Sequence, residues 1–414
     1  MSGDEIIACR ECDLLQRVPR GNGVFRCARC NAELLKISPG SFDRALAYTI
    51  AAICLFVVAN TFSIVRIAVG GNHQSTTLLA AAKTLWNEGM PEIGMLVFLT
   101  TFLVPAAQLA GVTYLLLPLR WGNLLPGGRQ VLKLLSHVEP WSMIEVFMLG
   151  LLVSVVKLGS LAHVEPGIAL WAFCGLVVAM PAIASALEPH DLWRRILTPG
   201  GASARSALPS TASEAGWLVC HTCGLASHPA ATGAHGYCPR CGSALHERKQ
   251  NSVARTWALV IAAAILYIPA NVMPVMNTSS LFGFERDTIM SGVVYLWTSG
   301  DAPLALLVFF ASITVPVLKL IALTVLLISV QRRTTWQPLQ RAKLYRLVEF
   351  VGRWSMLDIY VVTLMAALVQ IQSLATITAG PGAVAFGAVV VITMFAATSF
   401  DPRLIWDPMR EKNG

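Results

Sequence analysis

Eight of the ten cysteines in this 414-residue chain fall into four Cys-x-x-Cys pairs, and fourteen residues separate the two pairs of each half. The pairs are Cys9/Cys12, Cys27/Cys30, Cys220/Cys223 and Cys238/Cys241. Four thiolates at this spacing are the ligand set of a closed tetrahedral zinc site, which leaves no open position for a reacting water. The sequence therefore predicts two structural Zn²⁺ sites and disfavours hydrolytic zinc chemistry.

Redox dithiols and iron–sulfur ligation are the other chemistries that Cys-x-x-Cys pairs support. The pairs here come in quartets with metal-ligand spacing, which favours zinc over both alternatives. A module of about 25 residues is too small to be stable on a hydrophobic core alone, so bound metal would supply its folding free energy. We expect each module to be a zinc ribbon that docks or rigidifies the protein.

Four ionisable residues lie inside apolar stretches, where a charge is costly unless it is paired or hydrated. The four are Glu145, Asp358, Lys157 and Lys319; the partners of the two lysines in the repeat described below are Gln370 and Gln108. Ser154 and Ser312 share a helix face with the nearby lysine of their own stretch. These residues predict a polar track used in transport. The alternatives are a buried polar network that holds helices together and, for the two acids, an interfacial role.

An internal repeat organises the elements that must position these groups. With a shift of 211 the first cysteine quartet superposes on the second, and Asn60 maps onto Asn271 and Pro105 onto Pro316. After a two-residue insertion the match resumes, with Trp141 on Trp354. The chain is therefore a tandem duplication of about 210 residues, each copy a cysteine module followed by an apolar region.

The composition places the apolar regions in a membrane. The chain is 55% hydrophobic and 13% charged, with a mean hydropathy of +0.62, whereas soluble domains are about a quarter charged. A spanning helix needs roughly 20 apolar residues. The stretches that satisfy this length are 44–66, 91–118, 140–160 and 167–187 in the first copy, and 254–276, 302–330, 353–375 and 381–400 in the second. The sequence predicts an all-α polytopic membrane protein with eight transmembrane helices.

The basic residues determine the predicted orientation. Of the 31 lysines and arginines, 26 lie in 1–44, 119–139, 188–255, 331–353 and 401–414. The segments on the opposite side contain only Arg66, Lys83 and Arg286. Positive charge concentrates on the cytoplasmic side of membrane proteins, so both termini and both cysteine modules are predicted to be cytoplasmic and the repeat to be parallel. Because this charge is spread over loops, a nucleic-acid partner is not expected.

The predicted domains are 1–43 (zinc ribbon 1), 44–190 (first membrane module), 191–216 (linker), 217–250 (zinc ribbon 2), 251–402 (second membrane module) and 403–414 (cytoplasmic tail). Small residues, serine and proline are frequent in the second part of the linker. The outer segments 67–90 and 277–300 are large enough for a few strands, but not for an enzyme domain. The chain contains no phosphate-binding glycine loop and no nucleophile elbow. We therefore expect no enzymatic activity.

These features together resemble the paraquat-inducible protein A family. The resemblance rests on the duplicated cysteine quartets, four spans per copy, the repeated Trp-Ser-Met-x-Glu/Asp motif, Val-Lys-Leu at 156–158 and the motif FDPRLIWD at 400–407. The first copy departs from it, since Glu188-Pro189-His190-Asp191-Leu192-Trp193 is a weaker match to that last motif. The resemblance implies two four-helix bundles similar to tetraspanins or claudins.

The resemblance also implies a function. Members are bacterial inner-membrane proteins that work with a periplasmic partner carrying MCE domains, which conducts phospholipid between the inner and outer membranes. The expected function is to pass lipid between the inner membrane and this tunnel, with the polar track gating the lipid path. Two alternatives remain open: a scaffold that only anchors the MCE partner, and a thiol–disulfide membrane oxidoreductase.

Overall fold

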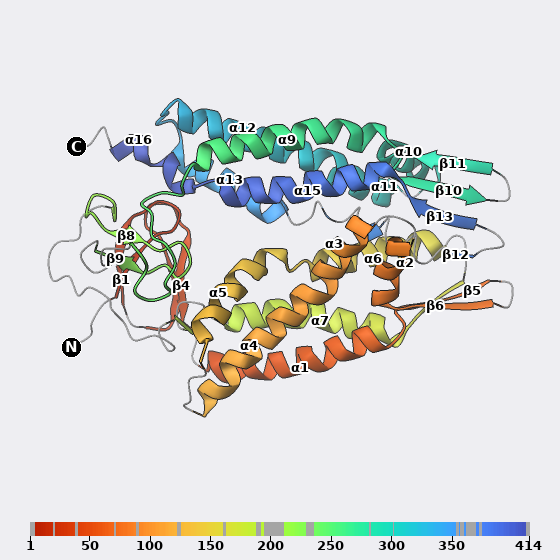
Figure 1. The fold of residues 1–414 in the computed structure, drawn as a ribbon, viewed down its shortest axis with the longest axis horizontal. Helices are drawn as coiled ribbons and strands as arrows, with labels where there is room; N and C mark the ends of the chain where they lie inside the picture. The colour runs from red at the N-terminus through yellow and green to blue at the C-terminus, as the bar shows by residue number, and fades with distance from the viewer. Residues whose placement is uncertain are drawn as a thin grey trace.

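The computed structural model is an elongated, mostly helical molecule whose ends differ in character (Figure 1). It describes residues 5–19, 21–37, 40–69, 72–87, 91–121, 126–159, 163–187, 192–193, 211–228, 236–280, 283–300, 302–352, 356, 360–361, 370–371 and 375–410. Both cysteine modules and both termini lie at one end, and two small sheets lie at the other (Figure 1). The two copies therefore run in the same direction, as a parallel repeat requires.

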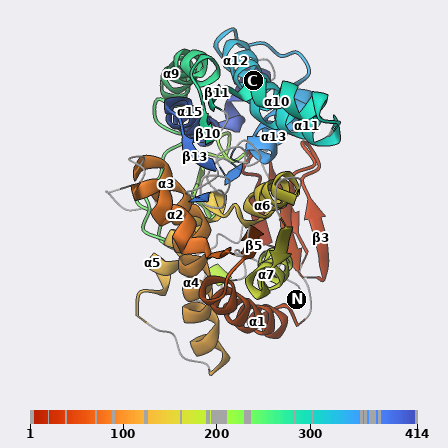
Figure 2. The same ribbon diagram turned by 90° about the vertical axis from the view of Figure 1, so that its right-hand side faces the viewer.

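The two copies form two helical groups that lie side by side, which we call module 1 and module 2 (Figure 1). Module 1 comprises α1 (Ser41–Thr61), α2 (Leu78–Asn87), α3 (Pro91–Phe98), α4 (Val104–Arg120), α5 (Gly128–Val138), α6 (Ile144–Gly159) and α7 (Ile168–Ala186). The helices described for module 2 are α9 (Ser252–Val272), α10 (Ile289–Thr298), α11 (Ala302–Phe309), α12 (Val315–Gln331), α13 (Pro338–Gly352) and α15 (Pro381–Ser399). Viewed along the long axis, α6 lies between the two groups (Figure 2).

Six described helices are long and apolar enough to cross a membrane: α1, the continuous helix Pro91–Arg120, α7, α9, Ala305–Gln331 and α15. Their outward side chains are apolar and exposed, with Val178 at 71%, Val272 at 72% and Ile268 at 66%. A band of this kind is stable against lipid and unstable against water. These six helices coincide with six of the eight expected spans.

The third expected span of each copy is the point of difference. In the first copy it is α6, whose described apolar part, Ile144–Val155, is shorter than a full span. In the second copy, most of residues 353–375 lie outside the described residues. The count of eight transmembrane helices thus remains a prediction.

Each long second span contains a π-helical segment in its first half. The segments are η1 (Leu99–Leu103) and η4 (Phe310–Thr314), which the repeat places at equivalent positions. Pro105 and Pro316 follow one residue after them, at the second position of the next α-helical segment. A proline removes a backbone donor and its ring clashes with the preceding turn, and a wider π turn accommodates both effects. The duplication has retained this irregularity in both halves.

The segments expected to be cytoplasmic loops, 119–139 and 331–353, contain helices instead. In α5, Leu132 is buried and Val131 and Leu135 pack against the core, while Arg129 and Lys133 lie on other faces. Apolar residues three and four positions apart are the signal for such a helix. The basic residues of these segments favour a cytoplasmic loop, although the apolar spacing favours a helix.

Small antiparallel sheets form at the end opposite the cysteine modules (Figure 1). In module 1, β5 (Val65–Val69) pairs with β6 (Asn72–Thr76) and with β7 (His163–Pro166). In module 2, β10 (Met276–Ser280) pairs with β11 (Gly283–Asp287) and with β13 (Ala375–Ala379), which also pairs with β12 (Gln370–Ile371). The outer segments, which are large enough for a few strands, therefore do contain strands. The helices α2 and α10 were not expected there.

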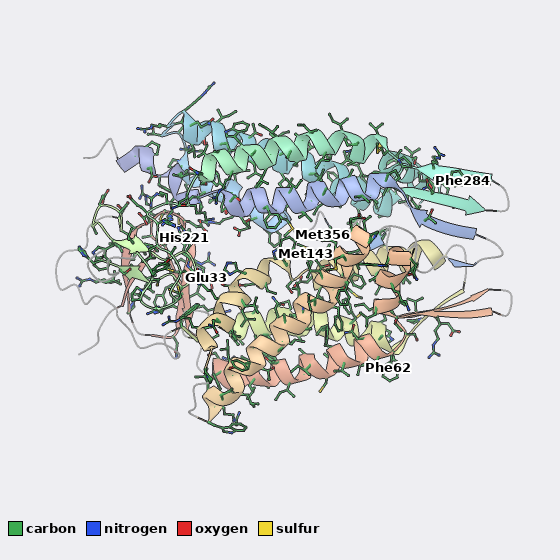
Figure 3. The ribbon with its side chains drawn as sticks, viewed as in Figure 1. Glu33, Phe62, Met143, His221, Phe284 and Met356 are labelled. Carbon is green, nitrogen blue, oxygen red and sulfur yellow. The ribbon has the colours of Figure 1, made fainter. Side chains whose placement is uncertain are left out.

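The contact between the modules uses residues at equivalent positions of the repeat. Phe147 of α6 packs edge-on against Tyr360 with ring centroids 5.2 Å apart, and the shift of 213 maps one residue onto the other. Met143 and Met356, likewise equivalent, are both fully buried in the same hydrophobic core, and Figure 3 labels both near the middle of the molecule. The Tyr360 hydroxyl donates a 2.9 Å hydrogen bond to Thr100 Oγ1 of η1. The module interface therefore lies about a pseudo-twofold axis.

Candidate metal centres and buried polar sites

Two short hairpins hold each cysteine quartet. The first ribbon uses β1 (Glu5–Ala8) with β2 (Leu15–Val18) and β3 (Gly23–Arg26) with β4 (Glu33–Ile37). The second uses β8 (Leu218–Val219) with β9 (Ala226–Ser227) and a bridge between Tyr237 and Ala244. Cysteine pairs at the hairpin turns bring four sulfurs to one point.

The four Cys-x-x-Cys turns share one backbone geometry. In each, the residue after the second cysteine donates to the carbonyl of the first cysteine and has a positive φ. These residues are Asp13 (φ 66°), Asn31 (φ 60°), Gly224 (φ 72°) and Gly242 (φ 68°). Glycine adopts this conformation freely, and Asn and Asp are the other residues that tolerate it best. All four residues therefore suit the turn, including the two that are not glycine.

The sulfur positions fit a tetrahedral metal. In the first quartet, Sγ of Cys9 and Cys30 are 3.5 Å apart, as are those of Cys12 and Cys27. In the second quartet the corresponding separations are 3.4 and 3.6 Å. A tetrahedron with metal–sulfur bonds of about 2.3 Å has sulfur–sulfur edges of about 3.8 Å, whereas a disulfide needs roughly 2.05 Å. All eight cysteines are free and buried, so each quartet could hold a metal ion.

A buried arginine beside the second quartet favours a negative charge at that quartet. Arg240, between Cys238 and Cys241, is buried, and its Nε and Nη1 atoms have no hydrogen-bond partner within the described part of the chain. A buried cation without a nearby anion is strongly destabilising. Four thiolates around Zn²⁺ have a net charge of about −2 and would compensate it.

The first ribbon docks on module 2 by means of two of its loops. Arg346 of α13 pairs with Glu11 at 2.7 Å and donates to the carbonyl of Cys30 at 2.6 Å. The Arg29 guanidinium lies 4.4 Å from the centroid of Trp406, in the FDPRLIWD motif. Burial raises the pKa of the Glu11 carboxyl, and the charge of Arg346 opposes this shift. The ribbon of the first copy is thus fastened to the membrane module of the second.

A buried ion network joins the first ribbon to the C-terminal motif. Arg403 contacts Asp401 at 3.0 Å and Asp13 at 3.8 Å, and all three side chains are at least 95% buried. Arg248, which follows the second ribbon, contacts Asp13 at 3.3 Å and Asp407 at 2.6 Å. Because Asp13 also accepts from the Ser213 amide, one carboxylate ties together three distant segments.

Arg403 also determines the charge state of its neighbours. Burial alone would raise the pKa of Asp401, but hydrogen bonds from Arg403 and its charge lower that pKa to about 2. Burial of the ring nitrogens and the Arg403 charge lower the pKa of His221 to about 4, so at neutral pH the ring accepts from Arg403 at 2.9 Å. His221 therefore has a hydrogen-bonding partner and is not left to serve as a metal ligand.

Among the predicted track residues, Lys319 has the clearest environment. Its side chain is 97% buried in module 2, and Nζ donates a 3.0 Å hydrogen bond to Thr393 Oγ1 of α15. An added Cβ on Gly352 would lie 3.0 Å from Nζ, so the glycine leaves room for the ammonium group. Burial of a cation with one hydroxyl partner is an expensive arrangement in a membrane protein and marks a candidate functional site.

The other track residues are only partly brought together. Ser154 and Ser312 are buried but donate to carbonyls of their own helices, at Gly150 and Val308. Gln108 Oε1 is buried with no described partner, and Glu145 is half-buried in the first turn of α6. The side chains of Lys157 and Gln370, and Asp358 as a whole, lie outside the described residues.

Sequence reasoning missed Thr393, Arg403 and Tyr360. The FDPRLIWD motif contains Arg403, but the pattern gives no reason for a contact with Asp13, 390 positions away. Thr393 and Tyr360 are single hydroxyls in apolar stretches, where they are usual helix residues. The one sequence signal is a difference between the copies. The position equivalent to Thr393 has Met180 and the one equivalent to Tyr360 has Phe147, so each hydroxyl is found in the second copy alone.

Comparisons with known proteins agree over nearly the whole chain. A family model described as Paraquat-inducible protein A matches residues 42–197 and 253–410. Intermembrane transport protein PqiA of Escherichia coli K12 is 34% identical over 98% of this chain and 96% of its own length. Lipophilic envelope-spanning tunnel protein A of the same organism is 30% identical over 98% of the chain and 92% of its own length. A probable intermembrane transport protein of Haemophilus influenzae is 29% identical over 97% and 96%. No solved structure matches the chain.

Proposed function

Because this chain belongs to the paraquat-inducible protein A family, we propose that it is the inner-membrane component of a lipid transport system. It passes phospholipid between the inner membrane and a periplasm-spanning tunnel formed by a partner with MCE domains. The observation that carries this proposal is the full-length similarity to proteins named for intermembrane transport and to one named as a lipophilic envelope-spanning tunnel protein. It is not an enzyme.

The two different ends of the molecule support this assignment. The end with the ribbons and termini is rich in basic residues and is cytoplasmic, as the positive-inside rule requires. The sheets of β5, β6 and β7 and of β10, β11, β12 and β13 then face the periplasm. Exposed sheet edges at that end offer backbone groups that a partner strand can pair with.

Each cysteine quartet holds one structural Zn²⁺. The eight ligands are Cys9, Cys12, Cys27, Cys30, Cys220, Cys223, Cys238 and Cys241. With four sulfurs at each metal, zinc supplies folding free energy and no catalysis. The same closed geometry disfavours a thiol–disulfide oxidoreductase, which needs an accessible thiolate. The ribbons fasten the two modules to each other on the cytoplasmic side.

The buried polar residues form the track that gates the lipid path. Lys319, held by Thr393, is its centre in module 2. Gln108 and Ser154 in module 1 and Ser312 in module 2 extend it, and Glu145 lies at its cytoplasmic end. Lys157, Asp358 and Gln370 complete it in the prediction from sequence. A lysine costs more in this setting than a neutral polar residue would, which supports a role in transport over one in helix adhesion.

The test uses substitutions at the two lysines. A double variant with Lys157→Met and Lys319→Met should bind the MCE partner normally but lose transfer of fluorescent phospholipid from proteoliposomes to that partner. The double Lys→Arg variant should retain more transfer, and Lys343→Met, at an exposed site on α13, is the matched control. Full transfer and full envelope integrity in the double Met variant would overturn the track.

The same experiment separates the alternatives. A scaffold would show intact assembly and no dependence of lipid transfer on either lysine. Purification of the chain in mild detergent should yield an MCE-domain protein and phospholipid. If thioredoxin-like proteins appeared in their place, the oxidoreductase alternative would be favoured.

A further inference from the structure

Module 1 contains a cavity of about 320 Å³ between α4, α5 and α7. Ligand pockets in proteins span roughly 300–1,000 Å³, so this cavity is large enough for part of a small amphiphile. Six large apolar side chains of the three helices line it: Leu109, Val112, Leu132, Leu135, Met180 and Ile183. Its mouth is at the ribbon end of the molecule, where Arg10, Glu33 and Lys36 of the first ribbon line it. Glu33 lies where that ribbon meets module 1 (Figure 3).

Two cationic side chains and one amide oxygen of the cavity are available to a ligand. No ion pair or hydrogen bond within the described part of the chain engages the side chain of Arg10 or Lys36. Two carboxylates, Glu33 and Glu139, line the same space. Deeper in, Gln108 lines the wall, and its buried Oε1 has no described hydrogen-bond partner. A buried acceptor without a donor is unfavourable, and a ligand could supply that donor.

Module 2 shows that this apolar space is a feature of one copy. At the positions equivalent to Leu132, Leu187 and Val112 it has Tyr345, Phe400 and Leu323, all buried. The first two rings lie 5.5 Å apart and the Tyr345 hydroxyl donates to the Ala397 carbonyl. Larger side chains therefore narrow module 2 at these three positions, whereas smaller ones stand at others, such as Thr393 for Met180 and Ala396 for Ile183.

The equivalent region of module 2 has a cavity of a different kind. This space of about 390 Å³ is lined by Lys319, Arg346 and Glu349, which are the equivalents of Gln108, Lys133 and Ser136 in module 1. Glu139 lines both cavities and so lies at their junction. After duplication, one copy has kept an apolar cavity and the other a charged one.

We propose that the cavity of module 1 binds a phospholipid whose headgroup has both a phosphate and an ammonium group. One acyl chain lies among the six apolar residues, the phosphate lies at Arg10 and Lys36, and the ammonium lies at Glu33 and Glu139. Two cations and two carboxylates at the mouth complement a zwitterionic headgroup better than an anionic one. The inference rests on the proposed function, because the bound molecule is the lipid cargo at the depth of the cytoplasmic leaflet.

The test is photolabelling of the full-length protein in mixed micelles. The probe is phosphatidylethanolamine with a photoactivatable acyl chain, and mass spectrometry maps the labelled peptides. Wild-type protein should be labelled on α4, α5 and α7. The double variant with Val112→Leu and Leu132→Tyr transfers module 2 residues into the cavity and should reduce this labelling about tenfold, as expected when a ligand loses a buried site.

A second double variant, with Arg10→Gln and Lys36→Gln, tests the headgroup contacts. Labelling should fall about tenfold, since hydrogen bonds to charged groups contribute more than neutral ones. Leu134→Tyr, on the exposed side of α5, is the control for added volume. A variant with Arg332→Gln and Lys343→Gln is the control for lost charge, because both residues are exposed in module 2. Both controls should label as wild type does.

The outcomes separate the possible ligands. A phosphatidylglycerol probe should label these helices less, and millimolar inorganic phosphate should not displace the zwitterionic probe. Displacement by phosphate would show a site for a free anion and overturn the proposal, as would equal labelling of the cavity-filling variant and wild type. Loss of labelling in that variant while wild-type protein transfers no lipid would leave the cavity assignment standing and refute the proposed function. Lipid transfer by wild-type protein without labelling of these helices would support the proposed function and refute the cavity assignment.

Discussion

At the scale of single residues, Asp401 shows how the C-terminal motif obtains its stability. Its carboxylate is 1% exposed and accepts from Arg403 and from the backbone amide of Lys249. Removing one partner from a buried ion pair leaves the other charge uncompensated. The pair therefore holds the ribbon end together only while Asp401 is ionised.

The pH dependence of Asp401→Asn follows from this. The pKa of Asp401 falls from 3.8 to about 2 on folding, which corresponds to stabilisation on the order of 2 kcal/mol. A lowered carboxyl pKa stabilises above the unfolded value, so the contribution is complete above pH 4 and is lost as the pH falls toward 2. Thermal unfolding in detergent should show wild type more stable than Asp401→Asn at pH 6, with the difference shrinking between pH 4 and 2.

Loss of zinc at low pH affects both proteins equally and cancels in that difference. An offset between wild type and Asp401→Asn that stays constant from pH 6 to pH 2 would contradict the assigned role of the carboxylate.

At the scale of elements, the duplication places Phe147 of α6 against its equivalent in the second copy, Tyr360. Phe147 and Tyr360 are equivalent, but only Tyr360 has a hydroxyl, and it donates to Thr100 in η1. The residue equivalent to Thr100 is Ala311, which has no acceptor on its side chain. The contact of Tyr360 with η1 is therefore polar, and its equivalent, Phe147 with the Ala311 position, has no such hydrogen bond.

Replacing Tyr360 by Phe makes the interface apolar on both sides. Because a buried hydrogen bond contributes about 1 kcal/mol net, Tyr360→Phe should destabilise the protein by about that amount through loss of the bond to Thr100, whose own hydroxyl still donates to the Leu96 carbonyl. A double-mutant cycle with Thr100→Val, followed by thermal unfolding in detergent, measures the coupling. Strictly additive effects would show that the hydroxyl pair contributes nothing to the contact between modules.

At the scale of the whole molecule, the ribbon of the first copy is attached to the membrane module of the second. Arg346 reaches both Glu11 and the Cys30 carbonyl, and Trp406 lies under Arg29. A displacement of the first ribbon would therefore alter contacts of α13 and Trp406 in the second copy. The first ribbon is therefore part of the contact between the two copies.

Loss of one metal ligand should expose that coupling. Cys12→Ser should lower the zinc content from two ions per chain to one, because a structural site with three sulfurs binds metal far more weakly. Limited proteolysis should then cleave α13 faster than in wild type, while α5 stays protected. Elemental analysis and peptide mapping give both results, and unchanged cleavage of α13 would contradict the docking role.

The sequence alone determined the duplication, both cysteine quartets, six of the spans and the family, because these depend on spacing, apolar length and charge along the chain. It also singled out Lys319, since a lysine in an apolar stretch stands out without any structure. Only the tertiary structure decided that Thr393 is its partner, that Arg403 meets Asp13, and that the cavity of module 1 has an apolar wall where the equivalent cavity of module 2 has charged residues. Those contacts join residues far apart in the chain. They depend on how separate elements pack together, and no local sequence pattern specifies that packing.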